Sequence, residues 1–194
     1  MTLEPRLVVA ARGHDGGSAV TLDEKVRPVT VGAWPGSEFF LLWGTEGSVE
    51  LDGGPPTPTT MPFFAGKGGT RLLFARYQPE SSAPAPVGDP DELAAEVERE
   101  LPGLLEVFES GDSGMHTTDT LDYGICLEGE LHLELDDGQE VRVTPGTCVV
   151  QLGTRHAWHN RGDRPALMCF VGIGAERAGR HEDARPRKSE QIQG

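Results

Sequence analysis

The stretch LDYGICLEGELHLELDDGQEVRV, residues 121–143, decides the fold class of this chain. Across residues 131–135 leucine alternates with histidine and glutamate, which gives one apolar and one polar face, as in a half-buried β-strand. The dipeptide Asp137-Gly138 favours a tight turn between two antiparallel strands. The stretch therefore predicts a β-hairpin with one face against a hydrophobic core.

Further apolar runs of strand length flank this hairpin. TCVVQL at 147–152, HAWHN at 156–160 and ALMCFVGIG at 166–174 follow it, separated by turns that contain Gly or Pro. In the N-terminal half the corresponding runs are RLVVAA (6–11), VRPVTVGAW (26–34), EFFLLW (38–43) and TRLLFARYQ (70–78). Strands that recur about every 8–12 residues are typical of a sandwich or small barrel. The chain is therefore predicted to be all-β.

Residues 89–108 interrupt this pattern and favour one short helical insert. Asp89 is suited to the N-cap and Pro90 to the first helical position, and Glu92 stands three residues after the cap. Leucine or valine then recurs at every fourth residue and makes one apolar stripe: Leu93, Val97 and Leu101.

One structural domain is expected, divided into four segments. Strands within residues 1–80 complete or extend the barrel, and residues 81–112 form a linker and an acidic helix. Residues 113–175 carry the core motifs, and the polar residues 176–194, which lack periodicity, form a flexible tail.

The composition places limits on partners and compartment. With 17 Lys and Arg against 31 Asp and Glu, the formal net charge is −14, which opposes binding to nucleic acid or to anionic membranes. No stretch approaches the ~18 apolar residues that span a bilayer, and the N-terminal residues do not resemble a signal peptide. The three cysteines lie in separate apolar runs, which favours buried, reduced thiols in a cytoplasmic protein.

A second informative pattern lies at Gly153–Asn160, where the order Gly-x2-His-x3-Asn is complete around His156. It is the later part of the motif Gly-x5-Pro-x-Gly-x2-His-x3-Asn, although Gln151 stands where that motif has proline. The chain therefore resembles the cupin superfamily, and the wider sequence is similar to a subgroup of single-domain cupins with an extended N-terminal half. The resemblance implies a double-stranded β-helix (jelly-roll) barrel, and it implies that His156 is a metal ligand.

The first cupin motif, Gly-x5-His-x-His-x3-4-Glu-x6-Gly, is matched only in part. Counting back from Gly129 puts Asp122 in the place of the motif glutamate. The two histidine positions depend on the spacing and fall on one of two pairs: Met115 and Thr117, or His116 and Thr118. At most one histidine of this motif is therefore present, and the usual set of four ligands is incomplete.

The resemblance implies a metal site formed by His116, Asp122 and His156. Two imidazoles and a carboxylate suit a divalent ion, Fe or Zn, that keeps open positions for substrate or water. Asp119 is a further candidate, as an alternative ligand or a catalytic group, and the phenol of Tyr123 is a candidate general acid. The substrate pocket is expected to include Gln151, Trp158 and Asn160.

These expectations favour a metal-dependent cupin enzyme that acts on a small organic molecule with a carbonyl or carboxylate group. Lyase, dehydratase, cyclase, isomerase and oxygenase chemistry all suit such a site. The alternative is a non-catalytic cupin that binds a small molecule in a barrel with a degenerate metal site. A ligand sensor for a DNA-binding partner is the third interpretation, but no helix-turn-helix pattern supports it. Because the N-terminal strands suit the extension of a partner's sheet, a homodimer is expected.

Overall fold

A computed structural model gives the fold of residues 3–13, 15–47, 49, 51, 57–111 and 114–177. The segment expected as a flexible tail lies outside the described residues from residue 178 onward. The elements run in the order β1 Arg6–Arg12, β2 Ser18–Lys25, β3 Glu38–Thr45, β4 Thr70–Tyr77, α1 Pro90–Glu100, η1 Leu105–Val107, β5 Thr120–Glu128, β6 Leu131–Glu134, η2 Asp136–Gly138, β7 Glu140–Val143, β8 Cys148–Leu152, β9 Ala157–His159 and β10 Ala166–Gly174.

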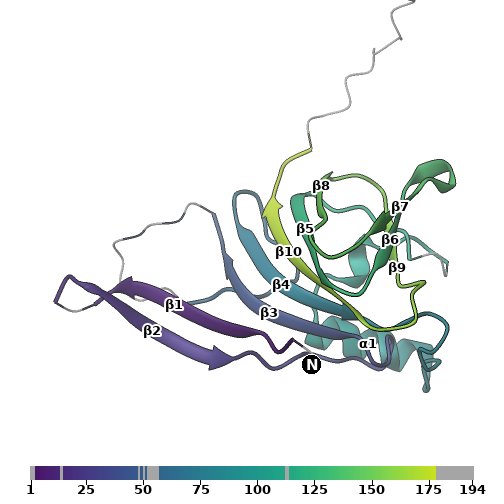
Figure 1. Ribbon diagram of the computed structural model, residues 1–194, viewed down its shortest axis with the longest axis horizontal. Coiled ribbons are helices and arrows are strands. Elements are labelled where there is room, and N and C mark those ends of the chain that lie inside the picture. The colour runs from purple at the N-terminus through teal and green to yellow at the C-terminus, as the bar shows by residue number, and fades with distance from the viewer. Residues whose placement is uncertain are drawn as a thin grey trace, which may run out of the picture.

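Two antiparallel sheets form the double-stranded β-helix that the resemblance implies (Figure 1). One sheet has five strands in the order β3-β4-β10-β5-β8, and the other has three in the order β7-β6-β9. Strand β10, the last in the chain, pairs with both β4 and β5. Residues of the N-terminal half and of the C-terminal half therefore share one sheet, and the predicted all-β fold with one helical insert is confirmed.

The hairpin predicted at residues 121–143 is made by β6 and β7. Leu131 is paired with Val143 and Leu133 with Val141 across the two strands. Leu131, Leu133 and Val143 are buried, so the apolar face predicted from the alternation points into the core. Asp137 and Gly138 have φ values of 58° and 71°, the backbone conformation that a type I′ turn requires.

Helix α1 begins and packs as its sequence predicts. The Asp89 carboxylate accepts hydrogen bonds from the backbone amides of Asp91 and Glu92, at 2.9 and 3.3 Å, and so caps the helix. Val97 and Leu101 are fully buried in one cluster with residues of β3 and β4. Burial of each such side chain contributes ~1.5–3 kcal/mol. The helix thereby covers the β3–β4 part of the five-stranded sheet.

The N-terminal strands differ from the prediction in two places. Residues 26–34 form no strand and touch the sheet through one bridge, between Val29 and Phe39. Pro28 in this run has no amide hydrogen to donate to a neighbouring strand. Instead Ser18–Lys25 forms β2, which pairs with β1 in a separate sheet that reaches away from the barrel (Figure 1). Because β2 is almost entirely exposed, its sequence has no buried face that a hydrophobic pattern reveals.

The three cysteines are free thiols that differ in burial. Cys126 is buried and Cys169 is half-buried, but Cys148 is exposed on β8, an edge strand of the five-stranded sheet. The expectation of three buried thiols is therefore wrong for Cys148, because the outward face of an edge strand has no second layer over it.

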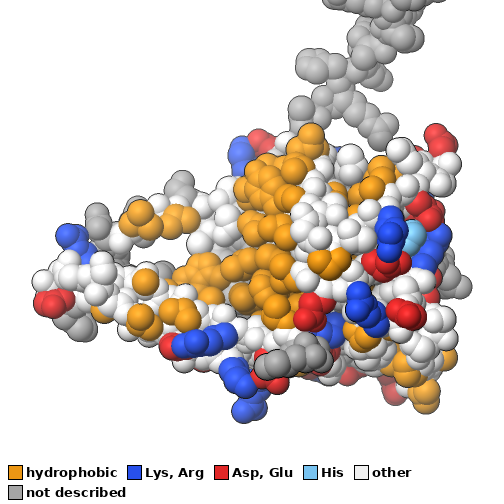
Figure 2. All heavy atoms as spheres, viewed as in Figure 1, with side chains coloured by type: hydrophobic (Ala, Val, Ile, Leu, Met, Phe, Trp, Pro, Cys, Tyr) orange, Lys and Arg blue, Asp and Glu red, His pale blue; other side chains and the backbone are white. Residues whose placement is uncertain are grey.

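The surface combines charged residues with apolar ones. Figure 2 shows hydrophobic side chains gathered in a band over β4 and β10 on the face viewed there. Elsewhere β8 exposes Val150 and Leu152, and the β1–β2 hairpin exposes Val8 and Val20. No described helix is long and apolar enough to cross a membrane.

Candidate functional site

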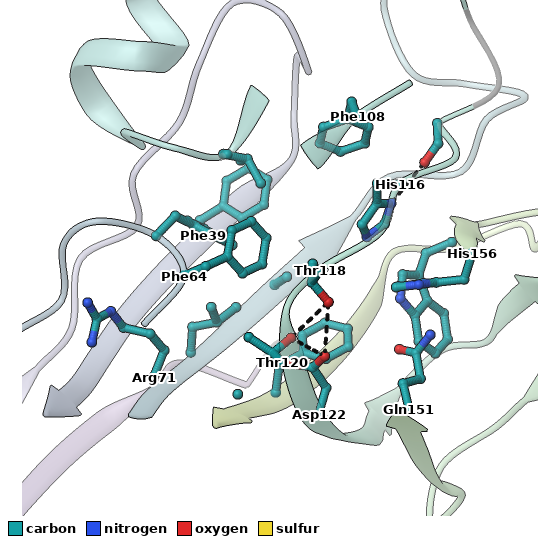
Figure 3. A pocket seen from close by; sticks show the side chains of 18 of the residues that line it. Phe39, Phe64, Arg71, Phe108, His116, Thr118, Thr120, Asp122, Gln151 and His156 are labelled. Carbon is teal, nitrogen blue, oxygen red and sulfur yellow. Dashed lines mark hydrogen bonds between the residues drawn. The ribbon is translucent and has the colours of Figure 1, made fainter. Parts of the chain in front are cut away.

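A cavity of about 240 Å³ lies inside the barrel, and both sheets contribute to its walls (Figure 3). Asp122 and Phe170 reach it from the five-stranded sheet, and Trp158 from the three-stranded sheet. Most of the wall is aromatic or aliphatic. The aromatic lining residues, apart from histidine, are Trp34, Phe39, Phe63, Phe64, Tyr77, Phe108, Trp158 and Phe170. The few polar groups in this apolar wall therefore determine what chemistry the cavity can support.

His116 and His156 meet in this cavity. Their backbones form a two-way bridge, with His116 N donating to His156 O at 2.9 Å and His156 N donating to His116 O at 3.0 Å. The bridge holds the imidazole rings with their centroids 4.1 Å apart and their planes tilted by 53°. Phe108 packs on the other side of His116, at 4.8 Å between centroids. Two imidazoles separated by forty residues of sequence are thus fixed side by side.

Hydrogen bonds fix the protonated nitrogen of each ring. Nδ1 of His116 lies 3.0 Å from the Gly114 carbonyl oxygen, and Nδ1 of His156 lies 2.8 Å from that of Thr154. A carbonyl oxygen can only accept, so each Nδ1 carries the hydrogen and each Nε2 of the neutral ring carries a lone pair. Among the described residues neither Nε2 has a hydrogen-bond partner.

Burial keeps both imidazoles neutral. Desolvation, together with the nearby His116 ring, lowers the pKa of His156 to about 4. Desolvation also lowers the pKa of His116, against a weaker opposite effect of its bond to Gly114. At neutral pH the cavity therefore presents two uncharged imidazoles whose Nε2 atoms can accept protons.

Asp122 supplies a carboxyl group in the same cavity. Its Oδ2 accepts a hydrogen bond from the Thr120 hydroxyl at 2.6 Å, and the hydroxyls of Thr120 and Thr118 are themselves hydrogen-bonded at 2.8 Å (Figure 3). Burial raises the pKa of Asp122, and the bonds from the two threonines oppose this rise. Thr118, Thr120 and Asp122 line the cavity together because alternate residues of one extended segment face the same side.

Gln151 lies beside Asp122, its register partner on the neighbouring strand β8. The side chain lines the cavity, and the residue is only 5% exposed. Its amide nitrogen is buried without a hydrogen-bond partner, the one such side-chain atom among the described residues. A buried donor of this kind is uncommon because its desolvation is uncompensated.

The residues of the cavity do not fit the three-ligand metal site expected from the sequence. His116 lines the cavity, which selects the shorter of the two spacings of the first motif. With that spacing, Thr118 stands where the motif has its second histidine. The Asp122 carboxylate accepts hydrogen bonds from the hydroxyls of Thr118 and Thr120. Within the described part of the chain, no three His, Cys, Asp or Glu side chains lie close enough together to hold a metal ion.

Three other expected site residues lie outside the cavity lining. Tyr123 is 37% exposed, because alternation along β5 turns it away from Asp122. Asp119 is exposed and pairs with Arg177. The buried Asn160 amide donates to the carbonyls of Tyr77 and Arg164, at 2.8 and 3.0 Å, and so ties loops together. Tyr123, Asp119 and Asn160 therefore lie outside the lining of this cavity, unlike the other expected site residues.

Other lining residues were not expected from the sequence. Phe108 follows helix α1 and packs on His116, and Tyr77 ends β4 with its phenol in the cavity wall. Burial raises the pKa of Tyr77, so its hydroxyl stays protonated. No sequence motif marks these two residues: Phe108 is joined by a β-bridge to His116, only eight positions along the chain, and Tyr77 is paired with the distant Ala166 of β10. Trp158 and Gln151 were expected to line the pocket, and they do.

Comparisons with known proteins agree with this architecture. Residues 104–172 match the profile of the cupin domain family. The phomopsin biosynthesis cluster protein D of Diaporthe leptostromiformis is 42% identical over 82 residues, which are 39% of this chain and 43% of that protein. The cupin-domain-containing oxidoreductase fogC of Aspergillus ruber is 37% identical over 71 residues, 35% of each chain. The matched region thus spans less than half the length of these curated relatives.

Among solved structures, a putative ethanolamine utilization protein Q from Salmonella typhimurium aligns with a TM-score of 0.42 and 14% sequence identity. The alignment covers 90% of this chain and all of that one. The family match over residues 104–172, which include β5 to β9 and most of β10, identifies this part of the chain as a cupin domain, and β3 and β4 complete its five-stranded sheet.

Proposed function

We propose that the protein is a cupin enzyme that transfers protons on a small, largely apolar organic molecule with an oxygen-bearing group. The observation that carries this proposal is the pair of neutral imidazoles, 4.1 Å apart, in an otherwise apolar cavity. Each ring is held by an Nδ1 hydrogen bond to a backbone carbonyl, which leaves its Nε2 as a base. Positioned neutral bases of this kind contribute ~10²–10⁴-fold to proton-transfer rates.

The chemistry follows from the groups present. Nε2 of one imidazole removes a proton from a carbon next to a carbonyl group. The electron pair of the broken C–H bond forms a C=C bond, and the carbonyl oxygen becomes an enolate oxygen. The resulting imidazolium returns its proton to the same or another carbon, which restores the neutral ring. Isomerisation, cyclisation and elimination all use such a step, and the polar groups near the rings would stabilise the oxygen.

The relatives support an enzyme without fixing its reaction. Several are named as cupin-domain-containing oxidoreductases, and others as members of biosynthesis clusters. An oxidoreductase step would require an electron acceptor in addition to the residues described. Removal of a proton from carbon is the part of such a reaction that His116 and His156 can perform themselves.

Exchange of carbon-bound hydrogen tests the proposal. Phenylacetone in D₂O is followed by ¹H NMR, and we expect the wild-type protein to accelerate exchange of the protons next to the carbonyl. His116→Gln and His156→Gln should each lower the accelerated rate by ~100-fold or more. His132→Gln, on a residue that does not line the cavity, is the matched control and should leave the rate unchanged.

Acceleration that survives both cavity substitutions would refute proton transfer by the pair. Binding of the probe without any acceleration would instead support the alternative of a non-catalytic small-molecule-binding cupin.

A further inference from the structure

We infer that Gln151 is the specificity-determining residue of the cavity, and that it binds the uncharged carbonyl oxygen of a compact aromatic ligand. This inference rests on the proposed function because it names the substrate class of the same cavity. It concerns binding, however, and not turnover, so the two can fail separately.

The side-chain amide nitrogen of Gln151 lacks a hydrogen-bond partner within the described part of the chain. Gln151 is 95% buried, lines the cavity, and has an amide nitrogen with no partner among the described residues. An amide can donate two hydrogen bonds, and a buried donor without a partner destabilises the protein. The unpaired amide lowers the stability of the folded protein until a hydrogen-bond acceptor enters the cavity. A ligand oxygen that accepts this hydrogen removes the loss of stability on binding.

Gln151 occupies a polar part of the cavity. In the cupin motif this position is proline, which has neither an amide hydrogen nor a polar side chain, so the donor is a feature of this chain. It faces the cavity beside Asp122, with His156 on the loop that follows β8 (Figure 3). An oxygen held by Gln151 therefore lies in the same polar part of the cavity as the imidazoles, while the aromatic walls receive the rest of the molecule.

The charged groups of the cavity favour an uncharged ligand. Arg71 is the cationic side chain among the described lining residues apart from histidine. Its guanidinium is already bonded to the carbonyls of Pro62, Thr45 and Thr70 and to the Glu46 carboxylate. A carboxylate ligand would thus be buried beside Asp122 with no free cation to pair with, which is unfavourable. An uncharged carbonyl needs only the donor that Gln151 offers.

The size and the lining of the cavity limit the ligand to a compact ring. A dry protein cavity of about 150 Å³ accommodates benzene, so a cavity of about 240 Å³ takes ~10 non-hydrogen atoms by the same proportion. The aromatic side chains around it favour a flat ring through stacked and edge-to-face contacts. The ligand class is therefore a single aromatic ring with a short side chain that carries a ketone or aldehyde.

Isothermal titration calorimetry with two matched probes tests this inference. Phenylacetone carries the carbonyl, and methallylbenzene has the same skeleton with C=CH₂ in place of C=O. We expect wild-type protein to bind phenylacetone at least tenfold more tightly, because only the ketone satisfies the buried donor. Gln151→Leu should reduce this preference to less than twofold. Gln139→Leu, the same change at an exposed turn position, should keep the full preference.

The unfolding temperatures of the variants show whether a lost preference reflects a lost fold. Gln151→Leu should unfold at the same temperature as wild type or higher, since an unpaired buried amide is replaced by an apolar group of similar size. If Gln151→Leu does not fold, Gln151→Met, which keeps the length of the side chain, provides the same comparison.

Equal affinity of wild-type protein for the two probes would overturn the inference, and so would a preference that survives in Gln151→Leu or Gln151→Met. A tenfold preference without any hydrogen exchange would uphold it while refuting the proposed proton transfer. Accelerated hydrogen exchange without a preference for phenylacetone would uphold the proposed proton transfer and refute the role of Gln151.

Discussion

Acid should destabilise this protein through His156, and the effect can be calculated from the structure. The residue is 4% exposed, and burial lowers its folded-state pKa to about 4. In the unfolded chain the pKa of an imidazole is ~6.5. Between these values the unfolded state binds more protons than the folded state, so the free energy of unfolding decreases as the pH falls. The stabilisation is complete above pH ~6.5 and is lost progressively toward pH ~4.

The size of the effect follows from the pKa difference. A difference of ~2.5 pH units corresponds to ~3 kcal/mol over the full range, of which ~2 kcal/mol is lost between pH 7 and pH 5. The lowered pKa of His116 acts in the same direction. The raised pKa of Asp122 acts in the opposite direction, because its folded state takes up a proton more readily than the unfolded chain. A comparison of wild type with a variant at position 156 isolates the histidine.

Urea denaturation at pH 7, 6 and 5 supplies the assay. The stability advantage of wild type over His156→Gln should shrink by ~2 kcal/mol from pH 7 to pH 5, a large fraction of the ~5–15 kcal/mol of a typical domain. His132→Gln, on a residue that does not line the cavity, shows how the loss of an imidazole outside the cavity changes the pH dependence of the free energy of unfolding. A constant difference between wild type and His156→Gln across this range would show that the ring is not a buried neutral base.

Three further predictions concern the fold and the assembly. Asp89→Ala removes the N-cap of α1 and should lower the free energy of unfolding by ~1 kcal/mol, measured by urea denaturation; no change would mean that the cap is replaced by water. Leu101→Ala opens a cavity under α1 and should cost ~2–5 kcal/mol, and a cost below 1 kcal/mol would contradict its complete burial. The apolar band over β4 and β10 (Figure 2) and the protruding β1–β2 hairpin lead us to expect a homodimer, so light scattering should report about twice the 20.8 kDa chain mass, and a stable monomer would contradict this.

The parts of the fold that the sequence predicts are those set by neighbouring residues. The β6–β7 hairpin depends on the alternation at 131–135 and on Asp137-Gly138, which is all local information. Helix α1 likewise depends on Asp89 and on a stripe within three turns. Strand β2 escapes prediction because it has no buried face, and residues 26–34 contain Pro28, whose effect on pairing outweighs the apolar composition of the run.

The site residues that belong to a sequence motif are predictable. Those that reach the cavity only through packing against other residues are not. His156 sits within a complete motif, and counting from Gly129 places Asp122 correctly in the cavity. The sequence leaves two spacings open for His116, and only the backbone bridge to His156 decides between them. Tyr123 follows Asp122 directly, so the alternation of side chains along β5 turns it outward, and it is 37% exposed. Phe108 lies only eight residues before His116, and a β-bridge joins the two, but no sequence motif marks their contact.

His116 and His156 are two neutral rings, each protonated at Nδ1 and each with an Nε2 that lacks a partner among the described residues. Long-range ¹H–¹⁵N correlation spectra of ¹⁵N-labelled protein at pH 7 measure this directly, because the nitrogen shifts of an imidazole distinguish its two tautomers and its charged form. We predict that both rings are neutral Nδ1–H tautomers, with an Nε2 signal that moves when phenylacetone is added. A charged ring at either position, or the Nε2–H tautomer, would contradict the account of the site.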